Sequence, residues 1–122
     1  ALNLSGWNDD PYGQPGAIRN FVGMTQHGGS DAARRGQRLT MGPWTHGVPS
    51  LSRTVYSGRD FGPNATYDFV EEQLRFFDYW LKKKDNGFST EPPVGSLASR
   101  VTPAFCIAIA FASPAWPSTR VR

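Results

Sequence analysis

Cysteine and long apolar runs are scarce in this chain of 122 residues. The one cysteine, Cys106, excludes a disulfide within the chain, and its place between Phe105 and Ile107 is typical of a small buried hydrophobic residue. No apolar run is long enough to cross a bilayer, so we expect no membrane partner. Neither His27 nor His46 has ligand-type neighbours at metal-site spacing, so we expect no metal and no cofactor.

Acidic residues are missing from the end of the chain. Residues 1–91 hold all ten Asp and Glu and ten of the thirteen Lys and Arg, so that segment is neutral. The net charge of +3 therefore comes from Arg100, Arg120 and Arg122. Because nucleic-acid-binding proteins gather their basic residues on one face, this distribution predicts no nucleic-acid partner.

An initiator methionine and a signal-peptide pattern are also absent. The sequence starts at Ala1, inside a segment that has the pattern of a strand. We interpret the chain as a piece of a longer protein. It carries no targeting segment that would separate a cytoplasmic from a secreted protein, and no motif that sets an oligomeric state.

Strand patterns occur twice in the first half of the chain. Residues 1–6 alternate leucine with small polar residues, and residues 37–42 place Leu39 and Met41 on one face. A helix is predicted from Pro15 to near Gly23. The polar, glycine-rich residues 25–37 and the irregular residues 47–63 are predicted to be loops.

The most pronounced helical pattern covers residues 65–84, with Asn64 as the N-cap and Gly87 placed for a C-terminal cap. Its apolar stripe is expected to pack on a sheet and consists of Phe69, Val70, Leu74, Phe77, Trp80 and Leu81. This order of elements predicts an α/β fold in which residues 1–6 and 37–42 are neighbouring parallel strands. Two strands cannot bury both faces, so we expect further strands from an N-terminal part outside this chain.

Two loops that follow the predicted strands hold residues suited to catalysis. The first loop carries Asp9 and Asp10, and the second carries His46. Open α/β sheets bind their ligands at the ends of such strands, and α/β-hydrolases place the acid and then the histidine of a Ser-His-Asp triad in this order. In such a triad the histidine takes the proton of the serine, and the carboxylate fixes its tautomer. Spacing alone favours the simpler interpretation, an N-cap or turn aspartate and a loop histidine without a catalytic role.

Several blocks together resemble one family. They are Gly6-Trp7-Asn8-Asp9, Gly42-Pro43-Trp44-Thr45-His46-Gly47, Phe61-Gly62, Phe77-Asp78-Tyr79-Trp80-Leu81-Lys82, Asp85-Asn86-Gly87 and Glu91-Pro92-Pro93-Val94. In order and spacing, over residues 1–94, they resemble the CocE/NonD hydrolases, which include cocaine esterase and X-Pro dipeptidyl-peptidases. The resemblance implies that residues 1–90 are the C-terminal part of an α/β-hydrolase catalytic domain. It implies that residues 91–122 are a linker and the truncated start of a β jelly-roll domain.

The resemblance also assigns roles to residues. It makes Asp9 the triad acid and His46 the triad base, while Asp10 is a competing acid at a variable position before a proline. It places Trp7 and Trp44 at the mouth of the substrate pocket, although ordinary core packing explains both equally well. Asn8 departs from the family, which has tyrosine or phenylalanine there.

The nucleophile of that family is missing from this chain. No Gly-x-Ser-x-Gly elbow occurs, and residues 28–32, the nearest imitation, lie between Asp9 and His46, where we expect only a surface turn. We therefore expect a serine hydrolase by family, an esterase, acylase or dipeptidyl-peptidase acting on a small-molecule ester or amide, but an inactive polypeptide alone. The alternative is a non-catalytic carbohydrate- or partner-binding module that uses Trp7, Trp44 and the aromatic residues of the long helix.

The tail departs from the family as well. Residues 95–122 are free of acidic residues and rich in Ala, Pro, Ser and Arg, a composition typical of GC-rich DNA read out of frame. We interpret this tail as a frameshifted or chimeric end, with a divergent family member as the alternative. We expect it to be poorly packed, including its apolar run over residues 104–112.

Overall fold

The structure, a computed structural model, describes residues 1–10 and 13–96. Its main sheet has three parallel strands in the order β1 (Leu2–Gly6), β2 (Arg38–Gly42) and β5 (Val94–Ser96). Strands β1 and β2 pair from Leu2 opposite Arg38 to Gly6 opposite Gly42. The prediction that residues 1–6 and 37–42 form neighbouring parallel strands is therefore confirmed.

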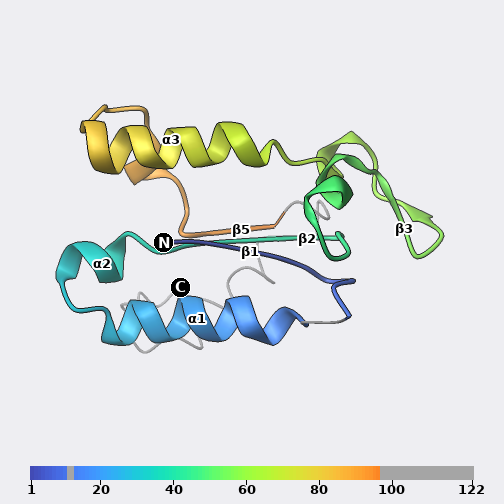
Figure 1. Ribbon diagram of the computed structural model, residues 1–122, viewed down its shortest axis with the longest axis horizontal. Coiled ribbons are helices and arrows are strands. Elements are labelled where there is room, and N and C mark those ends of the chain that lie inside the picture. Colours follow the sequence, from blue (N-terminus) through green and yellow to red (C-terminus); the bar gives the residue numbers. More distant parts are fainter. Residues whose placement is uncertain (11–12, 97–122) are drawn as a thin grey trace, which may run out of the picture.

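Helices lie on both faces of this sheet (Figure 1). On one face runs α1 (Gln14–His27), followed by the short α2 (Asp31–Arg35), and on the other face runs α3 (Phe69–Lys82). The remaining short elements are η1 (Val48–Ser52), β3 (Val55–Tyr56), β4 (Arg59–Asp60), η2 (Pro63–Ala65) and η3 (Phe88–Thr90). Within residues 1–10 and 13–96, no helix is long and apolar enough to span a bilayer.

Helix α1 covers one face of the sheet through an apolar core. Phe21 is buried against Leu39 and Met41 of β2, with Ile18 and Val22 packed around them. Pro15 stands in the first turn, where its fixed φ suits a helix. The predicted end near Gly23 is wrong, because the helix continues to His27. A glycine inside a helix costs only about 1 kcal/mol, which this packing offsets.

Residues 25–37, predicted to be a loop, are the end of α1, a turn, and α2. The Ser30 side chain accepts a hydrogen bond from the amide of Ala33 and so caps α2. The Gly28-Gly29-Ser30 segment is thus a turn between two helices, as expected for a structural role.

A second core lies on the α3 side of the sheet. Trp44, Leu51, Tyr56 and Ala65 form it, with other apolar side chains packed around them. The Tyr56 hydroxyl donates to the carbonyls of Ser50 and Arg53, so the chain folds around this buried ring. The prediction of an irregular stretch over residues 47–63 is therefore wrong, since it contains η1 and the β3–β4 hairpin.

Helix α3 is shorter than the predicted helix over residues 65–84. Asp68 is its N-cap and accepts a hydrogen bond of 2.9 Å from the amide of Glu71, so the prediction of Asn64 as the cap is wrong. Asn64 lies in η2 instead. At the other end the chain leaves the helix at Lys83, which adopts a left-handed conformation with φ of 57°, rather than at Gly87.

The face that α3 turns toward the protein also differs from the prediction. Leu74 and Phe77, which were expected to pack on the sheet, are 55% and 48% exposed. Instead, Phe76 and Tyr79 pack against Phe88, whose side chain is completely buried. The stripe prediction is therefore wrong for Val70, Leu74, Phe77 and Leu81, which are exposed, whereas Phe69 packs against the core of Trp44. Phe88 of η3, which comes later in the chain, packs beneath the helix instead.

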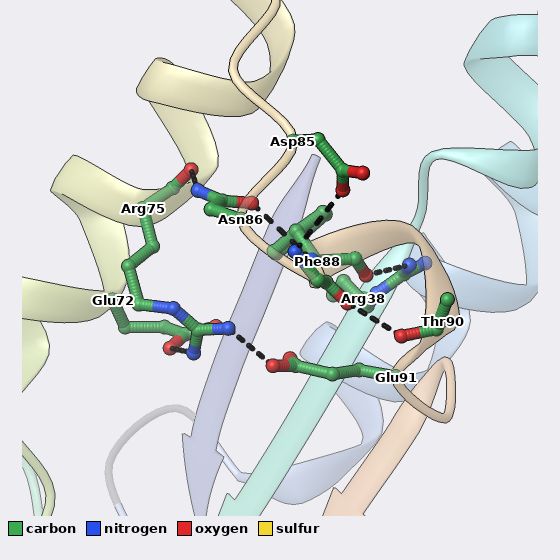
Figure 2. A network of polar contacts seen from close by, with 9 residues as sticks. Arg38, Glu72, Arg75, Asp85, Asn86, Phe88, Thr90 and Glu91 are labelled. Carbon is green, nitrogen blue, oxygen red and sulfur yellow. Dashed lines mark hydrogen bonds and ion pairs between the residues drawn. The ribbon is translucent and has the colours of Figure 1, made fainter.

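A polar network fixes the chain between α3 and β5 (Figure 2). The guanidinium of Arg75 forms ion pairs with Glu72 and Glu91, and Arg38 of β2 donates to the Phe88 carbonyl while lying 4.6 Å from its ring centroid. Burial lowers the pKa of Arg38, and the hydrogen bond that Arg75 donates to the Glu91 carboxylate raises the pKa of Arg75. The network therefore holds the segment before β5 in place, and β5 then pairs with β2.

The expected domain boundary after residue 90 falls inside this network. Strand β5 lies beyond it and pairs with β2, with Val94 opposite Leu39. The division into a catalytic domain and a jelly-roll start stays a prediction. Of residues 95–122, which we interpreted as a frameshifted or chimeric tail, residues 95 and 96 belong to β5. Residues 97–122, with the run over residues 104–112 and Cys106, lie outside the described residues, so the interpretation of the tail stays a prediction.

Candidate active site

The ends of β1 and β2 carry two loops that continue side by side. The amide of Trp7 donates to the carbonyl of Gly42 at 2.8 Å, and the amide of Asn8 donates to the carbonyl of Trp44 at 3.0 Å. These bonds extend the pairing of the two strands beyond the sheet. As a result, Asp9 of the first loop and His46 of the second loop reach the same place.

Asp9 and His46 are in contact. Nδ1 of His46 lies 3.3 Å from Oδ1 and 3.4 Å from Oδ2 of Asp9, at the loose end of the range expected for a site without substrate. The Asp9 side chain is 14% exposed and that of His46 is 58% exposed. The carboxylate is thus held inside the protein and faces Nδ1 of a ring that lies at the surface.

One oxygen of this carboxylate has an unusual environment. Oδ1 of Asp9 is buried and receives no hydrogen bond from the described residues, although Nδ1 of His46 is 3.3 Å away. Nδ1 of His46 is hydrogen-bonded to the other oxygen, Oδ2, at 3.4 Å, so its contact with Oδ1 is that of an ion pair. A buried carboxylate oxygen without a donor is costly, which favours a closer approach of the ring.

Asp10, the competing acid, takes no part in this contact. Its side chain is exposed, and it does not line the pocket beside His46. The structure therefore brings His46 together with Asp9 rather than with Asp10.

A pocket of about 200 Å³ opens beside the pair. Its polar lining residues are Asp9, His46, Ser5 and Thr45, and most of its wall is apolar. The apolar side chains that line it are those of Leu4, Trp44, Val48, Leu51 and Phe69. The pocket suits a small apolar group held next to an acid–base pair.

Trp44 lines this pocket and is also part of the core. It is 1% exposed, its Nε1 donates to the Ala65 carbonyl at 2.7 Å, and its ring centroid lies 5.4 Å from that of Tyr67. The close packing of Trp44 explains why positions 6 and 42 are glycine. A Cβ at Gly42 would lie 2.4 Å from the Trp44 ring, and one at Gly6 would lie 2.0 Å from its carbonyl oxygen.

Trp7, the second tryptophan predicted for the pocket, does not line it. It packs against the core of Phe21, Leu39 and Met41 on the α1 side of the sheet. Its carbonyl accepts a hydrogen bond from the Gln14 side chain. The structure thus brings one of the two predicted tryptophans to the pocket.

Asn8 makes contacts that the sequence did not predict. Its side-chain nitrogen donates to the carbonyl of Pro43, and its side-chain oxygen accepts from the Ser57 hydroxyl at 3.1 Å. Asn8 therefore links the acid loop, the histidine loop and the β3–β4 hairpin. The only signal in the sequence was its departure from the aromatic residue of the family.

Comparisons of this chain with protein-family models, curated proteins and solved structures give no match. The similarity to CocE/NonD hydrolases therefore depends on the motifs and stays a prediction. In residues 1–10 and 13–96, no three His, Cys, Asp or Glu side chains gather as ligands for a metal ion.

Proposed function

We propose that this chain supplies the acid, Asp9, and the base, His46, of a Ser-His-Asp triad in a CocE/NonD-type serine hydrolase. The substrate is a small-molecule ester or amide. The observation that supports the proposal most strongly is the contact between Asp9 and His46, made by loops that leave adjacent parallel strands at the same edge. Loops at this edge are where α/β-hydrolases hold these two residues.

Each residue then has a distinct task. In the proposed triad the Asp9 carboxylate faces Nδ1 of His46, and Nε2 of the same ring takes the proton of a serine hydroxyl and returns it to the leaving group. The carboxylate also stabilises the imidazolium that forms between these steps. The serine and the oxyanion hole come from outside this chain, since the sequence has no Gly-x-Ser-x-Gly elbow. The apolar pocket beside the pair accommodates a small acyl or leaving group.

The alternative, a carbohydrate- or partner-binding module that uses Trp7, Trp44 and the aromatic residues of α3, finds little support in its two tryptophans. Trp44 is 1% exposed and its Nε1 is used by a backbone carbonyl, so it offers no platform on which a sugar could stack. Trp7 is packed on the apolar core.

The test uses the longest reading frame that contains this chain, expressed and assayed with p-nitrophenyl esters and aminoacyl anilides. We expect a Gly-x-Ser-x-Gly elbow upstream of Asp9. His46→Ala should abolish measurable turnover, and Asp9→Asn should lower kcat by up to about 10⁴-fold. Asp10→Asn is the matched control and should leave kcat unchanged. A complete gene without the elbow, or full activity in both site variants, would contradict the proposal.

A further inference from the structure

The outer side of α3 carries a row of large apolar side chains. Val70 is 62% exposed, Leu74 55%, Phe77 48% and Leu81 73%. All four belong to the stripe that the sequence predicted for a packed face, and we call them the outer stripe. The opposite side of α3 is already occupied, because Phe76 and Tyr79 pack on Phe88. A contiguous exposed apolar row of this kind marks a surface for association.

The spacing of the outer stripe suits another helix. Its residues are separated by four, three and four positions, which is the seam spacing of paired helices. The order of these separations is the same in both directions along the helix. Two copies of α3 that run antiparallel therefore place Val70 opposite Leu81 of the second copy, and Leu74 opposite Phe77 of the second copy.

The charges of α3 determine the direction of such a pair. Asp68, Glu71 and Glu72 stand at the start of the helix. Three lysines, 82–84, stand at its end, where Asp78 is the acidic partner of two of them. The side chains of Lys82 and Lys84 remain 64% and 59% exposed in those pairs. An antiparallel arrangement puts the acidic start of each helix beside the basic end of the other, whereas a parallel arrangement puts like charges together.

We propose that this chain forms a two-fold dimer through an antiparallel contact between the α3 helices of two copies. The outer stripe forms the centre of the contact, and the oppositely charged helix ends form its two edges. Such a surface is self-complementary, as a two-fold interface requires, because every contact occurs twice.

The first experiment measures the oligomeric state of the full chain by sedimentation equilibrium. We expect a dimer, and we expect Leu74→Asp or Phe77→Asp to weaken dimerisation on the order of 100-fold or more, since each places two charges in an apolar seam. Val55→Asp is the matched control, because Val55 is 53% exposed but lies on the β3–β4 hairpin. Circular dichroism checks that each variant is folded, and Leu74→Ala serves as a milder change if Leu74→Asp does not fold.

The second experiment tests the direction of the helices by disulfide formation in a Cys106→Ser background. Val70→Cys mixed with Leu81→Cys should form a crosslink between the two variants. Val70→Cys alone should not, because the antiparallel arrangement separates its two copies by about 16 Å along the helix. A chain that is monomeric at every concentration would overturn the proposal. Efficient crosslinking of Val70→Cys with itself would do the same, since it indicates parallel helices.

Discussion

At the scale of single residues, the contact between Asp9 and His46 has a consequence that can be measured on this chain alone. The Asp9 carboxylate faces Nδ1 of His46, at 3.3 Å for the nearer oxygen. A carboxylate at that nitrogen favours the neutral imidazole that carries its proton on Nδ1. The tautomer is therefore a readout of the contact that does not depend on turnover.

We predict that neutral His46 is mainly the Nδ1–H tautomer in the wild-type chain and that Asp9→Ala shifts it toward the Nε2–H tautomer. Nitrogen-15 NMR of the two imidazole rings measures this, and His27→Gln identifies the His46 signals. Asp10→Ala is the control and should leave the tautomer unchanged. If Asp9→Ala has the same tautomer as the wild type, the carboxylate does not orient the ring.

Single residues of the site were predictable to different degrees. Asp9 and His46 could be predicted because each directly follows a strand, and parallel strands that pair bring such positions together. The core role of Trp44 depends on a carbonyl from η2, twenty-one positions later in the chain. The link between Asn8 and Ser57 could not be predicted, since Ser57 sits in a turn with φ of 50° whose position is set by the buried Tyr56.

At the scale of elements, Tyr67 joins the segment before α3 to the sheet. Its side chain lies beside that of Thr40 in β2, and its ring packs against Trp44. Burial raises the pKa of Tyr67 from its ordinary 10.0 to about 12. Because the pKa in the folded state lies above that in the unfolded state, the neutral phenol stabilises the fold fully below pH 10.0. That stabilisation is lost as the pH rises to about 12.

We predict that Tyr67→Phe, which lacks the ionisable hydroxyl, loses less stability than the wild type between pH 10.0 and about 12. The difference should be roughly 1 kcal/mol once solvent screening of this half-buried group is allowed for. Urea unfolding at several pH values below and within that interval measures it. Equal losses in both proteins would show that Tyr67 ionises as readily in the folded chain as in the unfolded one.

The existence of α3 was predictable, but its orientation was not. Local signals identify the helix, since Asp68 caps it and the apolar residues recur at helical spacing. Its apolar residues cover two opposite sides, however, one with Phe76 and one with Leu74. The choice between them depends on Phe88 and on the ion pair of Arg75 with Glu91, which come from later in the chain. Spacing within the helix holds no information about these partners.

At the scale of the whole molecule, the described residues form a three-stranded parallel sheet between helices. Its order, β1-β2-β5, was only partly predictable. The first two strands have a clear alternation of apolar and polar residues, whereas β5 has three residues, too few for a pattern. The resemblance placed these residues at the start of another domain, while the structure adds them to the same sheet. The α/β-hydrolase assignment stays a proposal that this arrangement is compatible with.

The last prediction concerns the chain without any upstream segment, which carries the proposed acid and base but no nucleophile elbow. Serine hydrolases react with fluorophosphonates because their serine is activated by the histidine and faces an oxyanion hole. The chain alone should therefore stay unlabelled by a fluorophosphonate probe. Its His46→Ala variant should stay unlabelled as well. Under the proposed function, a longer reading frame that encodes the elbow should yield a protein that is labelled, and His46→Ala should suppress that labelling. Gel fluorescence and peptide mass spectrometry measure both. Labelling of a serine within the chain alone, dependent on His46, would show that the nucleophile lies among these residues, and the proposed division of the triad would then be wrong.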